Sequence, residues 1–253
     1  MKKPLLFKCY LFTLLELVVC ISVIGILAGL LIPVLKTARE KANQISCFGN
    51  LRQLGTAIIS YAGDNKDFLP MVLPYLPGNP VSDVWWSLLY PELKNTEVFR
   101  CPSNPQGDFN TSLNNSSPGV PAIPISYEAN GGGGDALSAF GGRPPMGFLE
   151  HSLPKTGLWE ITNPSDTILL GEACSPNAKY AYFATHDSSS FRFTNHERRT
   201  NFQLCDGSAR SMKPKDTVST TWTMWTINNK WTVYNSKLPG WFELWESAPG
   251  QLP

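Results

Sequence analysis

The longest hydrophobic pattern in the chain runs from Phe12 to Leu35 and reads FTLLELVVCISVIGILAGLLIPVL. No residue from Leu17 to Leu35 carries a formal charge. As an α-helix, a run of this length crosses a hydrocarbon core of about 30 Å. A helix also satisfies its own backbone hydrogen bonds, which lipid cannot do. The pattern therefore predicts one membrane-spanning helix over residues 12–35.

The same stretch has features of a helix that packs against other helices. Ser22, Gly25 and Gly29 share one helical face, and Gly25 with Gly29 forms a G-x-x-x-G pair that lets a second helix approach closely. Pro33 removes one backbone donor and is expected to bend or loosen the helix near its end. Glu16 lies at the apolar boundary, where an unpaired carboxylate is costly, so we expect it to have a partner. An ordinary signal anchor or a cleaved signal peptide is the alternative interpretation.

After Pro33 the pattern becomes amphipathic. Apolar side chains recur at spacings of three and four, which predicts that residues 36–62 extend the helix and carry a domain on one face. Gly63, followed by Asp64 and Asn65, indicates the C-terminal cap of this helix. The stripe consists of Ile45, Phe48, Leu51, Leu54, Ile58 and Tyr61.

Residues 63–253 alternate short apolar runs with turn residues, and the whole chain of 253 residues holds 20 glycines and 21 prolines. This pattern predicts a loop-rich α+β domain. Residues 167–173 are expected to form a buried strand after a turn at residues 163–166. Residues 85–89 are expected to form a short helix or strand, and the acidic segment 64–70 a solvated turn, with a calcium loop as the weaker alternative.

The strongest hairpin pattern surrounds Asp206 and Gly207. Residues 201–205 and 208–212 are expected to form its strands, and an Asp-Gly pair favours a two-residue type I′ turn. His196 precedes this pair by nine intervening residues. It either forms hydrogen bonds to the hairpin or makes an acid–base pair with Asp206.

Charge and cysteine content narrow the classes of function. The net charge of +1 has no basic stripe, so no nucleic-acid partner is expected. Lysines on both sides of the apolar run leave its orientation open. Cys9 and Cys20 fall in or before the run, and four cysteines follow it. Those four allow three disulfide pairings or buried free thiols. They are Cys47, Cys101, Cys174 and Cys205.

No strong catalytic pattern is present. The three histidines form no H-E-x-x-H, and G-x-S-x-G is absent. His196 with three of the cysteines has spacings that match no standard zinc site. We therefore expect a protein that is not an enzyme and has no metal or cofactor. The cysteines weighed for zinc are Cys101, Cys174 and Cys205.

The segment Phe12-Thr13-Leu14-Leu15-Glu16 before a long apolar run resembles the N-terminal cleavage and methylation motif of type IV pilins and type II secretion pseudopilins. The resemblance implies that a prepilin peptidase cuts between Leu11 and Phe12, so that residues 1–11 are a leader and Phe12 becomes the methylated N-terminus. It also implies that Glu16, unpaired in one subunit, meets the terminal amine of a neighbour. Pro33 matches the helix-softening proline of that family, whereas Leu11 replaces its usual glycine.

A second pattern consists of His196, nine further residues and then Asp206-Gly207. Together with the N-terminal motif, it resembles the signature of a large group of bacterial pilin-like proteins. The resemblance covers residues 12–70 well and is patchy to residue 212. It implies a long helix packed on an antiparallel sheet. It also implies a single-pass protein of the bacterial inner membrane, with a cytoplasmic N-terminus and a domain in the periplasm or outside the cell.

These observations predict a filament subunit of a type II secretion system or type IV pilus that assembles with other pilin-like subunits through residues 12–62. One alternative is a non-polymerising, membrane-anchored protein that binds a glycan through C-terminal tryptophans. Another is a surface hydrolase that uses His196 and Asp206. The tryptophans concerned are Trp222, Trp225, Trp231, Trp241 and Trp245.

Overall fold

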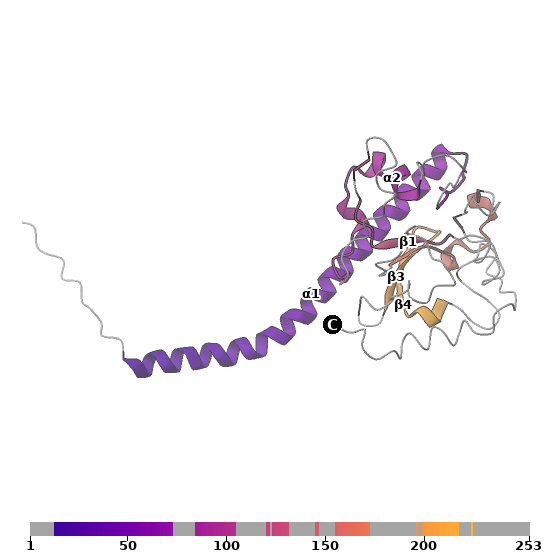
Figure 1. Cartoon of the computed structure of the whole chain (residues 1–253). Coiled ribbons are helices and arrows are strands. Elements are labelled where there is room, and N and C mark those ends of the chain that lie inside the picture. Colours follow the sequence, from indigo (N-terminus) through magenta and orange to yellow (C-terminus); the bar gives the residue numbers. More distant parts are fainter. Residues whose placement is uncertain are drawn as a thin grey trace, which may run out of the picture. The chain divides into compact units, whose positions relative to one another are not determined.

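The structure is a computed structural model, and the chain separates into two compact units, residues 1–42 and residues 43–253. Each unit is described by itself, and Figure 1 labels the elements. The predicted leader 1–11, Phe12 and the five C-terminal tryptophans lie outside the described residues. The structure describes residues 13–72, 84–104, 120–121, 123–131, 145–146, 155–172, 196, 199–217 and 224.

The first unit contains the N-terminal part of α1 (Leu14–Asp64), and we call residues 14–42 of this helix the arm. Its large apolar side chains from Leu14 to Leu35 are between 45% and 80% exposed. The helix is long and apolar enough to cross a membrane, a test that a signal sequence near the N-terminus also passes. Helix α1 includes Pro33, and the Thr37 hydroxyl donates to the Pro33 carbonyl at 3.3 Å.

In the second unit, residues 43–64 of α1 bury one face. The predicted positions Leu51, Leu54 and Ile58 are fully buried, and this part of the stripe is confirmed. The prediction that Ile45 belongs to the buried stripe is wrong, because Ile45 is 71% exposed, and Cys47 is buried instead. Two residues turn an α-helix by about 200°, so these two side chains point to nearly opposite sides.

Helix α1 ends at Asp64, two residues beyond the predicted end at residue 62. The N–H groups of Asn65 and Asp67 donate to the Ala62 carbonyl at 3.0 and 2.8 Å, which satisfies an acceptor of the last turn. Lys66 and Asp67 have φ values of 57° and 60°, so two non-glycine residues make the left-handed turn.

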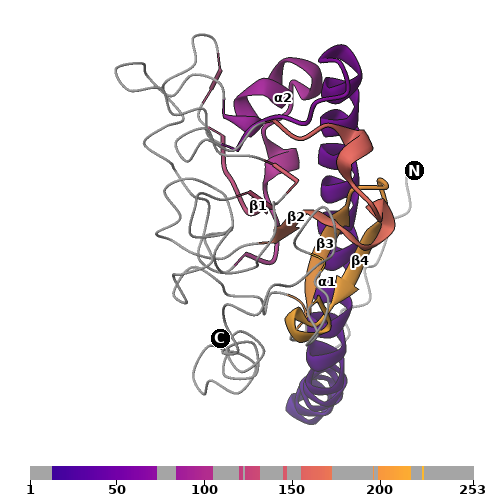
Figure 2. The same cartoon turned by 90° about the vertical axis from the view of Figure 1, so that its right-hand side faces the viewer.

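Four antiparallel strands form one sheet in the order β1-β2-β3-β4. Together with the helices they confirm an α+β layout. The predicted buried strand at residues 167–173 is β2, and the segment at residues 85–89 is helical. Figure 2 shows β3 and β4 beside the part of α1 in the second unit. The bounds are α2 (Trp85–Leu93), β1 (Tyr127–Ala129), β2 (Ile168–Glu172), β3 (Thr200–Leu204) and β4 (Ala209–Met212).

The predicted hairpin is confirmed, but its two-residue type I′ turn is wrong. The Leu204 N–H donates to the Ser208 carbonyl at 2.8 Å, so the last hydrogen-bonded pair of the hairpin encloses three residues, Cys205, Asp206 and Gly207. Gly207 has a φ of 85°, and Asp206 is not among the positive-φ residues. A type I turn followed by one left-handed residue is the usual three-residue hairpin loop, and it needs glycine only at its last position.

The core lies between the sheet and the C-terminal part of α1. Gly55 permits a close approach, because a Cβ there would lie 2.5 Å from Nε2 of the buried Gln203 on β3. A disulfide joins Cys47 of α1 to Cys101, which follows a short 3-10 helix, η1 (Glu97–Phe99). The largest fully buried side chains include Trp85, Trp86, Phe99, Tyr127 and Phe202.

Candidate functional site

The arm presents the residues that were predicted to mediate assembly. A Cβ placed on Gly25 or on Gly29 would have no neighbour within 4 Å among the described atoms, so the surface there is open. The Ser22 hydroxyl donates to the Val18 carbonyl at 2.7 Å. Open surface at a G-x-x-x-G pair provides the room that a second helix requires.

Glu16 has a partner within its own chain. Its Oε2 accepts hydrogen bonds from the N–H and the hydroxyl of Thr13, both at 2.9 Å, and the Glu16 N–H donates to Thr13 Oγ1 at 3.2 Å. This reciprocal pattern is a capping box, which satisfies donors at the helix start. Glu16 therefore has hydrogen-bond partners in its own chain, and its pairing with the terminal amine of a neighbour stays a prediction. Leu11 and Phe12, the predicted processing residues, lie outside the described residues.

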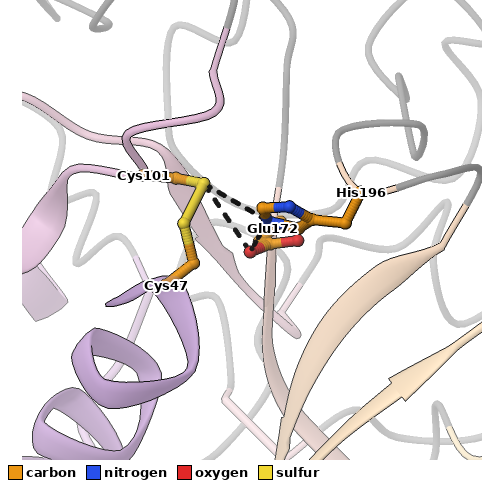
Figure 3. Close-up of side chains that lie close together, drawn as sticks. All are labelled: Cys47, Cys101, Glu172 and His196. Carbon is orange, nitrogen blue, oxygen red and sulfur yellow. Dashed lines mark hydrogen bonds and ion pairs between the residues drawn. A yellow bond between two sulfur atoms is a disulfide. The ribbon is translucent and has the colours of Figure 1, made fainter. Parts of the chain in front are cut away.

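A second candidate site is a buried cluster in the second unit. Cys47, Cys101, Glu172 and His196 come from four separate parts of the chain and are all buried. Figure 3 shows the Cys101 sulfur between Cys47 and the Glu172–His196 pair. One ligand atom from each residue lies within 4.8 Å of the other three.

Short contacts connect the members of this cluster. His196 Nε2 is 3.0 Å from Glu172 Oε1, and Cys101 Sγ is 3.6 Å from that nitrogen and 3.7 Å from that oxygen. Asn201 donates to both carboxylate oxygens of Glu172. Its backbone N–H reaches Oε2 at 2.9 Å and its Nδ2 reaches Oε1 at 2.8 Å. The carboxylate is therefore held in one orientation.

Backbone pairing explains how these residues meet. Glu172 ends β2 and is paired with Tyr127 of β1, while His196 exchanges backbone hydrogen bonds with Arg199 just before β3. The Tyr127 hydroxyl donates to the Cys47 carbonyl at 3.4 Å. Burial, and secondly the negative charge of Glu172, raise the pKa of Tyr127 well above its usual value, so this hydroxyl keeps its proton.

Two free cysteines among the described residues, Cys20 and Cys205, do not belong to the cluster. The structure selects Cys47–Cys101 from the pairings that the sequence left open. Cys205 is buried and free, and burial, with a smaller effect of the Asp206 charge, raises the pKa of its thiol. Cys20 is free and exposed on the arm, and Cys174 lies outside the described residues.

Two interpretations of His196 are corrected. It does not pair with Asp206. Instead it contacts Glu172, whereas Asp206 Oδ1 accepts the Ser208 N–H at 2.8 Å in the turn at the other end of β3. The cysteine set weighed for zinc is also wrong in part, because Cys47 lies beside Cys101 and His196 and the free Cys205 does not belong to the cluster. Glu172 was missed. The sequence does contain a signal for it, because Glu172 lies within the predicted buried strand at residues 167–173. A charged side chain buried in a strand needs a partner.

Glu128 is a second buried carboxyl group in the sheet. It is fully buried in β1, opposite Gly171 of β2, and neither of its oxygens has a hydrogen-bond partner among the described residues. Burial raises its pKa well above the ordinary value. Its neighbour Tyr127 points toward α1, so Glu128 points to the other face of the sheet, away from the cluster.

Comparisons with protein-family models, with curated proteins and with solved structures give no match. The function of this protein is therefore inferred from the two sites themselves. The arm is an exposed apolar helix with room for a neighbour. The cluster is an enclosed set of sulfur, nitrogen and oxygen atoms, which is suited to holding protons or a metal ion rather than to binding a large substrate.

Proposed function

We propose that this protein is a pilin-like structural subunit that is anchored in the bacterial inner membrane by the arm and assembles with other pilin-like subunits. The observation that carries the proposal is the exposed apolar surface from Leu14 to Leu35, which includes the open positions Gly25 and Gly29. A soluble protein rarely leaves so large a continuous apolar surface uncovered. Lipid and neighbouring arms together would cover it.

The proposed topology has a cytoplasmic N-terminus and an ectodomain in the periplasm or outside the cell, as in type II secretion pseudopili and type IV pili. A prepilin peptidase would cut before Phe12 and leave a methylated terminal amine. The capping box uses Oε2 of Glu16, and Oε1 takes no part in it. In this proposal Oε1 receives the terminal amine of a neighbouring subunit, which compensates both buried charges.

The test is Glu16→Gln, which keeps the shape of the side chain and removes its charge. We expect normal membrane insertion and at least a tenfold loss of crosslinked oligomers, because an unpaired buried ammonium costs several kcal/mol. Intact mass of the extracted wild-type protein should correspond to residues 12–253 plus one methyl group. A full-length mass together with unchanged crosslinking in Glu16→Gln would contradict the proposal.

Thr13→Val is the matched control. It removes one hydroxyl of the capping box and leaves the Glu16 charge in place. If pairing between subunits matters, Thr13→Val assembles nearly as well as the wild type. If both variants lose assembly equally, Glu16 acts only by capping its own helix.

The second candidate function is a membrane-anchored surface protein that does not polymerise and binds a ligand such as a glycan. Leu11 favours it, because the usual glycine before the cut is missing. Trp159 also favours it, because this residue is 64% exposed while its ring packs edge-on against Phe68 at 5.1 Å between ring centroids. This function predicts that Glu16→Gln changes nothing and that Trp159→Ala weakens glycan retention.

A further inference from the structure

We propose that Cys47, Cys101, Glu172 and His196 form a Zn²⁺ site when the two cysteines are reduced. The inference concerns the interior of the second unit and is independent of whether the protein assembles. It rests on four buried side chains whose ligand atoms lie together, within 4.8 Å of one another.

Two of the separations already match those of a tetrahedral zinc site. With Zn–S near 2.3 Å and Zn–N or Zn–O near 2.0–2.2 Å, tetrahedral angles place ligand atoms roughly 3.3–3.8 Å apart. Cys101 Sγ already lies 3.6 Å from His196 Nε2 and 3.7 Å from Glu172 Oε1. The nitrogen and the oxygen are 3.0 Å apart and need to separate only slightly. The two sulfur atoms are bonded and must move apart, which reduction allows.

The donor set suits zinc. Two thiolates, one imidazole and one carboxylate are all zinc ligands, and a closed four-coordinate site is typical of structural zinc. Asn201 holds both oxygens of Glu172, as the supporting residues around metal ligands commonly do. The four ligands are at most 2% exposed, so no open position for substrate or water is expected.

A disulfide alone does not account for the buried acid and imidazole beside it. Removing an ionisable pair from water is costly, and replacement by apolar side chains is often neutral or stabilising. A metal ion would use the imidazole nitrogen, the carboxylate oxygen and both sulfur atoms at once. The cluster therefore has two alternative closed states, one held by the S–S bond and one held by Zn²⁺.

The change from the disulfide to the zinc-bound state conserves electrons and protons. A dithiol reductant supplies two electrons and becomes a disulfide, and its two protons pass to Cys47 and Cys101. Zn²⁺ then binds both sulfur atoms as thiolates and displaces those two protons. Residues that flank both cysteines line a groove of about 240 Å³, which places this groove next to the disulfide, although none of the four ligands lines it. Its lining includes Ser46, Asn50, Arg100 and Pro102.

The experiment uses the full chain in detergent micelles, once oxidised and once reduced by a dithiol that is then removed without oxygen. Zn²⁺ is titrated into each form, and Co²⁺ serves as a spectroscopic probe of tetrahedral thiolate coordination. We expect one ion per reduced chain and at least 100-fold weaker binding to the oxidised chain. Bound Zn²⁺ should also slow alkylation of Cys47 and Cys101, but not of the exposed Cys20, a readout that needs no variant.

Variants then identify the ligands. His196→Ala and Glu172→Gln should each weaken zinc binding by more than 100-fold, and Asn201→Ala by about 10- to 100-fold. Cys205→Ser is the matched control, because Cys205 is a buried free thiol outside the cluster, and it should leave the affinity unchanged. A variant counts as folded if the Cys47–Cys101 disulfide re-forms in air.

Three results would overturn the proposal. One is reduced protein that binds no more Zn²⁺ than a Cys47→Ser/Cys101→Ser double variant. Another is unchanged affinity in a His196→Ala variant that still re-forms the disulfide. The third is reduced protein that unfolds rather than taking up the ion.

Discussion

The two parts of α1 differ sharply in their surroundings, although one helix contains both. Along the arm, large apolar side chains such as Leu30 are exposed, whereas beyond Asn43 the buried residues Leu51, Leu54 and Ile58 fill the core. From Leu17 to Leu35 the arm is apolar on all sides, and the part of the helix in the second unit is apolar on one face only. Hydrophobicity on all sides indicates a helix covered by lipid or by other helices, and a single stripe indicates packing on the helix's own domain.

The largest expected effect tests this contrast directly with two leucines of the same helix. Leu51→Ala should lower the free energy of unfolding of the second unit by about 2–5 kcal/mol, because it leaves a cavity in a packed core. Leu30→Ala should change it by less than about 0.5 kcal/mol. Denaturant titration in detergent, followed by tryptophan fluorescence, to which the buried Trp85 and Trp86 contribute, measures both. Equal losses would mean that the arm contributes to the same cooperative unit.

A smaller effect is expected from two glycines of α1. Gly55→Ala should destabilise the second unit by about 1–3 kcal/mol, since its Cβ would force the fully buried Gln203 to move. Gly49→Ala has no atom within 4 Å of its new Cβ and should stabilise the helix by up to about 1 kcal/mol. The same denaturant titration shows whether each variant lowers or raises the free energy of unfolding. A neutral Gly55→Ala would show that β3 does not fix the distance to α1.

The smallest effect concerns pH and Glu128. Because burial raises the pKa of its carboxyl, the folded state keeps this proton at pH values where the unfolded chain has lost it. Its contribution to stability is therefore full below the unfolded pKa, near 4.5, and is lost as pH rises toward the folded pKa. The denaturation midpoint of Glu128→Gln should therefore exceed that of the wild type by an amount that grows from pH 5 to pH 8. A constant difference across this range would contradict the assignment.

Local patterns predicted much of the fold. The apolar run, the stripe through Leu51 and Ile58, the strand at Ile168–Glu172 and the hairpin around Asp206-Gly207 each follow from a few neighbouring residues. Periodicity and turn chemistry are local, so a single sequence contains them. The turn type was wrong because an Asp-Gly pair suits loops of either two or three residues, and strand register decides between them.

The cluster could be predicted only in part. His196 and Cys101 were candidates, but Cys47 and Glu172 join them through helix packing and through β1–β2 pairing, which bring together residues far apart in the chain. The Cys47–Cys101 pairing was one of several possibilities, and only the fold selects it. A partner was expected for Glu16, and Thr13 is one that lies only three residues away in the sequence.

The disulfide also governs how the molecule responds to mechanical load. Cys47 is the first buried residue of α1, and its bond to Cys101 closes a loop of 54 residues. Tension applied through the arm would pass across sulfur at this point, so the enclosed segment could not be drawn out. Roughly 180 Å of extensible chain is thereby removed from the load path, at about 3.4 Å per residue. A subunit pulled by its N-terminal helix can extend only outside this loop, and the enclosed segment contains the rest of α1 and all of α2 with Trp85 and Trp86.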